Sequence, residues 1–228
     1  MSTILTRALA RRYLWLRHRV FGRRYRRLVL EQVDGLALLV LPEVFNPALF
    51  RTGPFLAETF KRLYPGPVTA GQRALDLGTG SGLCALAAAR AGFRAVGVDI
   101  NPEAVRCARI NALVNRLEGQ VEVREGDLFA PVAGERFDVV LFNPPFYRGA
   151  PRDALDHAWR GVGVFERFAA GLAEHLKPQG QALVVLSTDG DAPGMLNALR
   201  AEGYDPQPAA ARDLGNEVLT VYAAAARR

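Results

Sequence analysis

Apolar and polar positions follow one another in a regular order from residue 73 almost to the end of the chain. Short apolar runs predict buried strands, and longer stretches with apolar residues at every third or fourth position predict helices. The expected strands are 73–77, 95–99, 121–125, 137–142, 181–187 and 217–226. The expected helices are 82–91, 102–116, 162–176 and 193–202. The stretch "KPQG" at 177–180 is expected to end the third of these helices. Strands that alternate with helices indicate a parallel sheet covered by helices on both faces.

A different pattern precedes this alternation, because residues 27–42 contain two apolar runs separated by Asp34 and Gly35. These two residue types tolerate positive φ, so the pattern predicts a β-hairpin. A helix is expected next, with Thr52 or Gly53 as its cap.

The stretch "PGPVTAGQ" (65–72) predicts a loop that separates these elements from the main domain. We therefore expect three parts: a basic amphipathic helical arm over residues 1–26, a hairpin and lead-in helix over 27–70, and a large α/β domain over 71–228.

The first thirty residues carry the basic charge of the chain, with nine arginines and no acidic residue. The remainder has 20 basic and 23 acidic residues, so the net charge of +6 is a local feature. The segment predicts a helix whose apolar face is formed by Leu5, Leu9, Tyr13, Leu16 and Val20. Such a helix either packs on the domain or binds an anionic partner such as RNA, a ribosome or a membrane surface.

The composition is that of an ordinary globular protein, with 50% hydrophobic and 23% charged residues. Cys84 and Cys107 lie in expected helices without disulfide or metal-ligand spacing, and the three histidines are scattered. We therefore expect reduced thiols, a cytoplasmic location and no metal site. The apolar run 36–42 is too short to span a bilayer, so no transmembrane segment is expected. An organellar transit peptide is the alternative for the arginine-rich start.

A glycine-rich turn joins the first expected strand of the main domain to the following helix, in "RALDLGTGSGL" (73–83). Gly78, Gly80 and Gly82 allow a tight turn and a close approach of the backbone to a ligand. Asp99 ends the next strand, where a carboxylate can accept hydrogen bonds from both hydroxyls of a ribose. These features predict a cofactor that contains adenosine.

An acidic residue before the glycines distinguishes this turn from a dinucleotide site. The spacing is G-x-G-x-G, and Asp76 would repel a pyrophosphate. It would suit S-adenosylmethionine, which carries an ammonium group and a sulfonium. Asp127, after the third strand, could accept a hydrogen bond from the adenine amino group. The alternative is that Asp76 and Asp127 only cap helices.

At these positions the chain resembles the class I S-adenosylmethionine-dependent methyltransferases over about residues 73–226. The resemblance implies a Rossmann-like α/β fold, with a seven-stranded, mostly parallel sheet whose last strand is antiparallel. It also implies that residues 71–228 are the methyltransferase catalytic domain. The implied cofactor contacts are Thr52, Asp76, Gly78, Thr79, Gly80, Gly82, Asp99, Ile100, Asp127, Leu128 and Asn143.

The fourth expected strand ends in Asn143, Pro144, Pro145 and Phe146, which are the candidate catalytic residues. Ligands bind at this edge of open α/β sheets. The Asn143 side-chain oxygen and the Pro144 carbonyl can accept both hydrogens of a planar –NH₂ group, because Pro145 has no competing N–H. Phe146 offers a flat face for the same group. The alternative is an ordinary turn after a strand.

The motif resembles the [D/N]-P-P-[Y/F/W] signature of amino methyltransferases, and most of all the short form of the HemK/PrmC-like protein-glutamine methyltransferases. "VFNP" (44–47) and "HAWRGVGVFERFAAGLAEHLKPQG" (157–180) carry the same resemblance. The chain departs from that family at "ALFRTGPF" (48–55), where Arg51 precedes Thr52 and the acidic residue of the family is missing.

The resemblance implies N-methylation of a protein glutamine amide, as in a translation release factor. RNA or DNA amino methylation is the alternative that the arginine-rich arm favours, through contact with RNA or a ribosome. A catalytically silent cofactor-binding protein and a small-molecule methyltransferase are the further alternatives.

Overall fold

The computed structural model describes residues 27–145, 147–148 and 160–226. The expected arm, Phe146 and most of the loop after it lie outside the described residues. No helix within the described ranges is long and apolar enough to cross a membrane.

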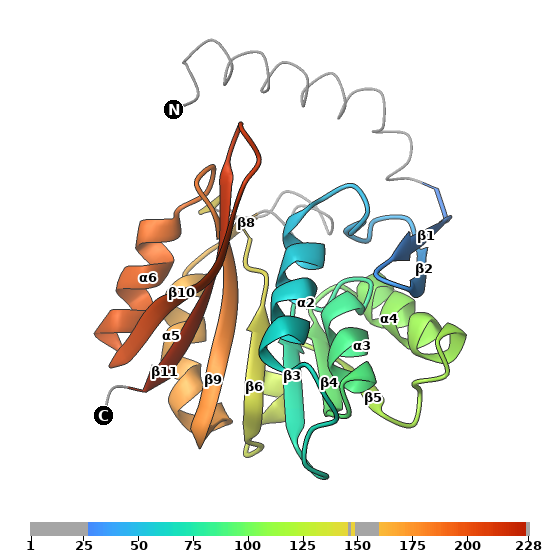
Figure 1. The fold of residues 1–228 in the computed structure, drawn as a ribbon, viewed down its shortest axis with the longest axis horizontal. Coiled ribbons are helices and arrows are strands. Elements are labelled where there is room, and N and C mark those ends of the chain that lie inside the picture. The colour runs from blue at the N-terminus through green and yellow to red at the C-terminus, as the bar shows by residue number, and fades with distance from the viewer. Residues whose placement is uncertain (1–26, 146, 149–159, 227–228) are drawn as a thin grey trace.

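A seven-stranded sheet forms the centre of the molecule, in the order β10-β11-β9-β6-β3-β4-β5 (Figure 1). β3, β4, β5, β6 and β9 are parallel, and β11 runs antiparallel to both β9 and β10. This confirms the expected sheet. Its strands are β3 (Arg73–Leu77), β4 (Arg94–Asp99), β5 (Val121–Glu125), β6 (Phe137–Phe142), β9 (Leu176–Ser187), β10 (Tyr204–Asp213) and β11 (Val218–Ala226).

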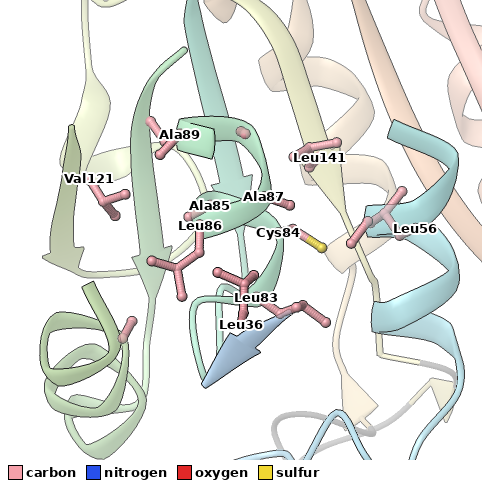
Figure 2. Close-up of a cluster of buried hydrophobic side chains, with 14 of the residues drawn as sticks. Leu36, Leu56, Leu83, Cys84, Ala85, Leu86, Ala87, Ala89, Val121 and Leu141 are labelled. Atoms are coloured by element: carbon pink, nitrogen blue, oxygen red, sulfur yellow. The ribbon is translucent and has the colours of Figure 1, made fainter. Parts of the chain in front are cut away.

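Helices cover both faces of the sheet and bury two apolar cores. On one face lie α2 (Thr52–Leu63), α3 (Leu83–Arg90) and α4 (Pro102–Val114), and on the other lie α5 (Val164–His175) and α6 (Ala192–Ala201). Figure 2 shows the first core, in which side chains from β2, α2, α3 and β6 meet. Successive residues of β6 alternate between the cores: Val139 and Leu141 face the first, Val140 and Phe142 the second.

The predicted hairpin is confirmed as β1 (Val29–Val33) and β2 (Leu36–Val40). Asp34 and Gly35 have φ of 53° and 74°, as a two-residue turn requires. Two asparagines of α4 fix β2 to the domain. The Asn111 amide bonds the N–H and C=O of Leu39 at 2.7 and 2.9 Å, and the Asn115 amide bonds those of Ala37 at 3.2 and 2.8 Å.

Two expectations for the elements were wrong, and one strand of the sheet, β10, was not located from the sequence. Its Pro206 and Pro208, which disfavour a central strand, are accommodated at the outer position of the sheet. The stretch 177–180 lies inside β9, where the pairing with β6 shifts register. Thr52 does not cap α2, since Arg51 occupies the cap position without a side-chain hydrogen bond.

A short parallel pair, β7 (Tyr147–Arg148) and β8 (Arg160–Gly161), follows the Asn-Pro-Pro segment. It leads into α5, which is followed by β9, the neighbour of β6 in the sheet.

Candidate active site

A cavity of about 360 Å³ opens at the carboxyl ends of β3, β4, β5 and β6. The chain changes direction across the sheet between β3 and β6, and ligands of open α/β sheets bind at such a point. The predicted site residues that line it are Asp76, Gly78, Thr79, Gly80, Asp99, Ile100, Asp127, Leu128, Asn143, Pro144 and Pro145.

Two of the predicted residues lie beside the cavity without lining it. Thr52 is buried at the start of α2, and its neighbour Gly53 reaches the cavity instead. Gly82 approaches α4 so closely that an added Cβ would lie 3.1 Å from the Cβ of Ala108. The absence of a side chain at Gly82 therefore allows the start of α3 to pack closely against α4.

The turn after β3 needs glycine for its backbone conformation, since Gly78 and Gly80 have φ of 64° and 54°. An added Cβ at Gly78 would have no atom within 4 Å. The backbone is therefore open to a ligand at this point.

Asp76 is a buried carboxylate, 4% exposed, in the wall of the cavity. Its Oδ2 accepts hydrogen bonds from Thr79 Oγ1 at 2.7 Å and from the Ala85 N–H at 3.0 Å. Burial raises the pKa of Asp76 to about 7, although these hydrogen bonds act in the opposite direction. Asp76 thus caps α3, as the structural alternative foresaw, and also presents a carboxyl group to the cavity.

Asp99 ends β4 with its carboxylate held by two backbone donors. Oδ2 accepts from Gly80 N at 2.8 Å and Oδ1 from Asn101 N at 2.9 Å. The orientation of the carboxylate is therefore set before any ligand binds. Ile100, 44% exposed, continues the same wall.

Asn143 follows β6 and carries an unused acceptor. Its Oδ1 is buried and has no hydrogen-bond partner among the described residues. Buried side-chain oxygens normally have a partner, so a missing one points to a ligand. The adjacent Pro144 and Pro145 also line the cavity.

Several residues of the cavity wall were not predicted from the sequence: Glu43, Phe45, Pro47, Cys84 and Arg167. Glu43 adopts φ of 65°, uncommon for a residue with a side chain, and its carbonyl accepts from Asn101 Nδ2 at 3.0 Å. "VFNP" was noticed only through the family resemblance. The sequence holds no local signal for Arg167, since its place depends on how α5 packs.

The residues present fit S-adenosylmethionine. The cavity offers carboxyl groups for an ammonium group, for ribose hydroxyls and for an adenine amine, and the glycine turn leaves room for the backbone to meet a ligand. Together with the strand order, this defines the class of methyltransferases that use S-adenosylmethionine.

Comparisons with known proteins agree with this class of enzyme. The model of the methyltransferase small domain family matches residues 36–202. A putative protein N5-glutamine methyltransferase of Methanocaldococcus jannaschii is 31% identical, over 76% of this chain and 87% of that protein. A release factor glutamine methyltransferase of Koribacter versatilis is 36% identical, over 68% of this chain but only 59% of that protein.

A solved structure resembles the fold. The Thermus thermophilus 16S rRNA N2 G1207 methyltransferase, in complex with AdoMet and guanosine, has a TM-score of 0.69 and 22% identity, over 88% of this chain and 50% of that one. This chain belongs to the methyltransferase small domain family. The findings confirm the enzyme class expected from the sequence, an S-adenosylmethionine-dependent N-methyltransferase.

Proposed function

We propose that this enzyme methylates the side-chain amide of a glutamine in a protein of the translation apparatus, with a release factor as the first candidate. The buried Oδ1 of Asn143, which has no hydrogen-bond partner in the described part of the chain, carries the proposal, because it offers an acceptor to a planar –NH₂ group. The names of the two relatives support the choice of acceptor.

We assign the cofactor to the carboxylate wall. When bound, S-adenosylmethionine supplies an electrophilic methyl group on a sulfonium sulfur. Asp76 would hold the ammonium group, Asp99 the ribose hydroxyls and Asp127 the adenine amino group. The two backbone donors already fix the Asp99 carboxylate, so binding requires little reordering there.

The chain contributes positioning to the reaction. An amide nitrogen is a poor nucleophile because its lone pair is delocalised. By accepting both N–H hydrogens, Asn143 Oδ1 and the Pro144 carbonyl would hold the nitrogen in a geometry that directs the lone pair at the methyl group. The proton can leave after the bond forms, so no strong base is needed.

The described part of the cavity wall is mainly acidic. Among the described residues that line it, the acidic ones are Glu43, Asp76, Asp99 and Asp127, and the basic one is Arg167. Arg167 is itself paired with Asp127. Asp76, Asp99 and Asp127 are the carboxylates assigned to the cofactor, so the support for a protein amide comes from the two relatives and not from this charge.

The acceptor class can be tested with isotope-labelled S-adenosylmethionine and a cell lysate. Samples are digested separately with protease and ribonuclease, and a labelled protein is mapped by mass spectrometry. We expect the label on a glutamine-containing peptide. Label that survives protease but is lost with ribonuclease would contradict the proposal.

Replacement of Asn143 by alanine tests the site itself. Asn143→Ala removes the proposed acceptor, so turnover should fall about 100-fold or more, as for other lost transition-state contacts. Stability should change little, because the deleted oxygen has no hydrogen-bond partner among the described residues. The dissociation constant of S-adenosylhomocysteine, measured by calorimetry, serves as the control for cofactor binding. Normal turnover by this variant would contradict the role of Asn143.

A further inference from the structure

One ion pair joins two walls of the cavity. Arg167 in α5 donates a hydrogen bond to Asp127, which follows β5, and both residues line the cavity. The two residues lie 40 positions apart in the chain. Their contact therefore depends on the packing of α5 beside the carboxyl end of β5.

Stability of the fold does not account for this pair. The side chains of Arg167 and Asp127 are 49% and 46% exposed, and pairs of that exposure add little to stability. The pair between Arg212 and Glu58 has nearly the same exposure, 41% and 49%, and neither residue lines the cavity. It provides a matched control for an ion pair without contact to the cavity.

The backbone around Asp127 is already fixed by its own neighbours. Gly126 N donates to the Asp99 carbonyl at 2.9 Å, and Ala130 N donates to the Asp127 carbonyl at 3.1 Å. Leu128 adopts φ of 47°, which turns the chain sharply after Asp127. What remains variable is the rotation of the Asp127 side chain, and Arg167 restrains it.

We infer that Arg167 is a positioning residue that makes the site selective for a 6-aminopurine. It holds one carboxylate oxygen of Asp127, which leaves the other oxygen directed at the amino group of adenine. A 6-oxopurine would place a carbonyl acceptor against that oxygen, and two acceptors cannot form a hydrogen bond. The inference rests on the proposed assignment of Asp127 to adenine.

The test compares two ligands by calorimetry, S-adenosylhomocysteine and S-inosylhomocysteine, which differ in the group at C6 and in the hydrogen on the adjacent N1. We expect the wild-type enzyme to prefer the adenosyl ligand by at least about tenfold, as sites that hydrogen-bond a substrate group do. Arg167→Met keeps an aliphatic side chain of similar length but removes the donors. It should weaken adenosyl binding and lower the preference to below about threefold, because the carboxylate is then free to rotate.

Three further variants separate the outcomes. Arg212→Met should keep the wild-type preference, and Arg167→Lys should keep part of it. Asp127→Asn should lose the preference, because its –NH₂ group can donate to the 6-oxo group. If Asp127→Asn loses the preference and Arg167→Met retains it, the role of Arg167 is overturned. If Asp127→Asn also retains it, Asp127 does not bind the purine and the inference falls with that assignment.

Methyl transfer to the protein acceptor at saturating cofactor provides an independent readout. It is measured in the wild-type enzyme and in Arg212→Met, whose residue does not line the cavity and whose activity should be unchanged. The glutamine proposal therefore stands or fails separately from the purine preference.

Discussion

Asp76 combines two roles that conflict energetically. Its carboxyl group caps α3 and faces the cavity, and its burial disfavours the charged form. A cationic ligand would restore that charge, because an opposite charge nearby favours ionisation. The residue therefore links cofactor binding to the first turn of α3.

Replacement of Asp76 by asparagine should stabilise the ligand-free enzyme. The pKa rises from 3.8 in the unfolded chain to about 7 in the folded one, so the folded state keeps a proton that the unfolded state releases. This lowers the free energy of unfolding as pH rises from about 4 to about 7. Asp76→Asn removes the effect, and the gain should be on the order of 1–3 kcal/mol, larger at pH 8 than at pH 5. Denaturant unfolding at both pH values checks this, and an equal gain at both would contradict it.

Cofactor binding should depend on pH through the same residue. Protonated Asp76 cannot pair with an ammonium group, so the dissociation constant of S-adenosylmethionine should increase as pH falls from 8 to 6. Calorimetry across this range measures the effect. Asp76→Asn is the control, because its weaker binding should not vary over the same pH range. A flat profile in the wild-type enzyme would show that Asp76 does not meet the cation.

Among the elements, the hairpin depends most on contacts far away in the sequence. Asn111 is fully buried, and its amide bonds Leu39 on both sides and the Ser81 carbonyl at 2.9 Å. It therefore connects β2, α4 and the glycine turn. The hairpin leads into residues 41–47, part of which line the cavity.

Asn111→Leu should destabilise the protein by roughly 2–4 kcal/mol, because the buried Ser81 carbonyl and the part-buried Leu39 N–H lose their amide partner, while the Leu39 carbonyl keeps the Cys107 thiol. Asn115→Ala should cost less, since water can reach that partly exposed position. Thermal unfolding measures both changes. An equal loss of stability in Asn111→Leu and Asn115→Ala would contradict the idea that the more buried amide contributes more to stability. Asn111→Leu should also weaken cofactor binding, because the loop after β2 forms part of the cavity wall.

The elements also show how far the sequence predicts this fold. Periodicity and the Asp34-Gly35 turn were enough for the hairpin, the parallel strands and the helices between them, because these signals are local. β10 was missed because its prolines normally exclude a strand, and they are tolerated here only because the strand lies at the outer position. Residues at strand ends were found by their spacing, whereas Glu43 and Arg167 reach the cavity through tertiary packing alone.

At the scale of the whole molecule, charge is distributed unevenly. Acidic residues predominate among the described residues of the cavity wall, while residues 1–26 contain eight arginines. The arm thus brings a charge opposite to that of the site. We predict from this charge that residues 1–26 bind an anionic partner such as RNA; packing on the domain is the alternative.

Deletion of residues 1–26 should weaken binding to ribosomal RNA or ribosomes and reduce its salt dependence, because fewer phosphate counterions are released. Methylation of an isolated protein acceptor should change little. Binding measured across a series of salt concentrations, with activity on the free acceptor as the control, tests this. Unaltered RNA binding would assign the arm a packing role.

The asparagine pair on α4 has a consequence for how this chain can vary. Four residues along a helix advance about 6 Å, close to the two-residue repeat of a strand. Asn111 therefore bonds Leu39 and Asn115 bonds Ala37 as residues of a neighbouring strand would. An insertion or deletion between them would rotate one amide by about 100° away from β2. Homologous chains should therefore tolerate exchanges at the exposed Leu113 and Val114, but not a change in the number of residues there.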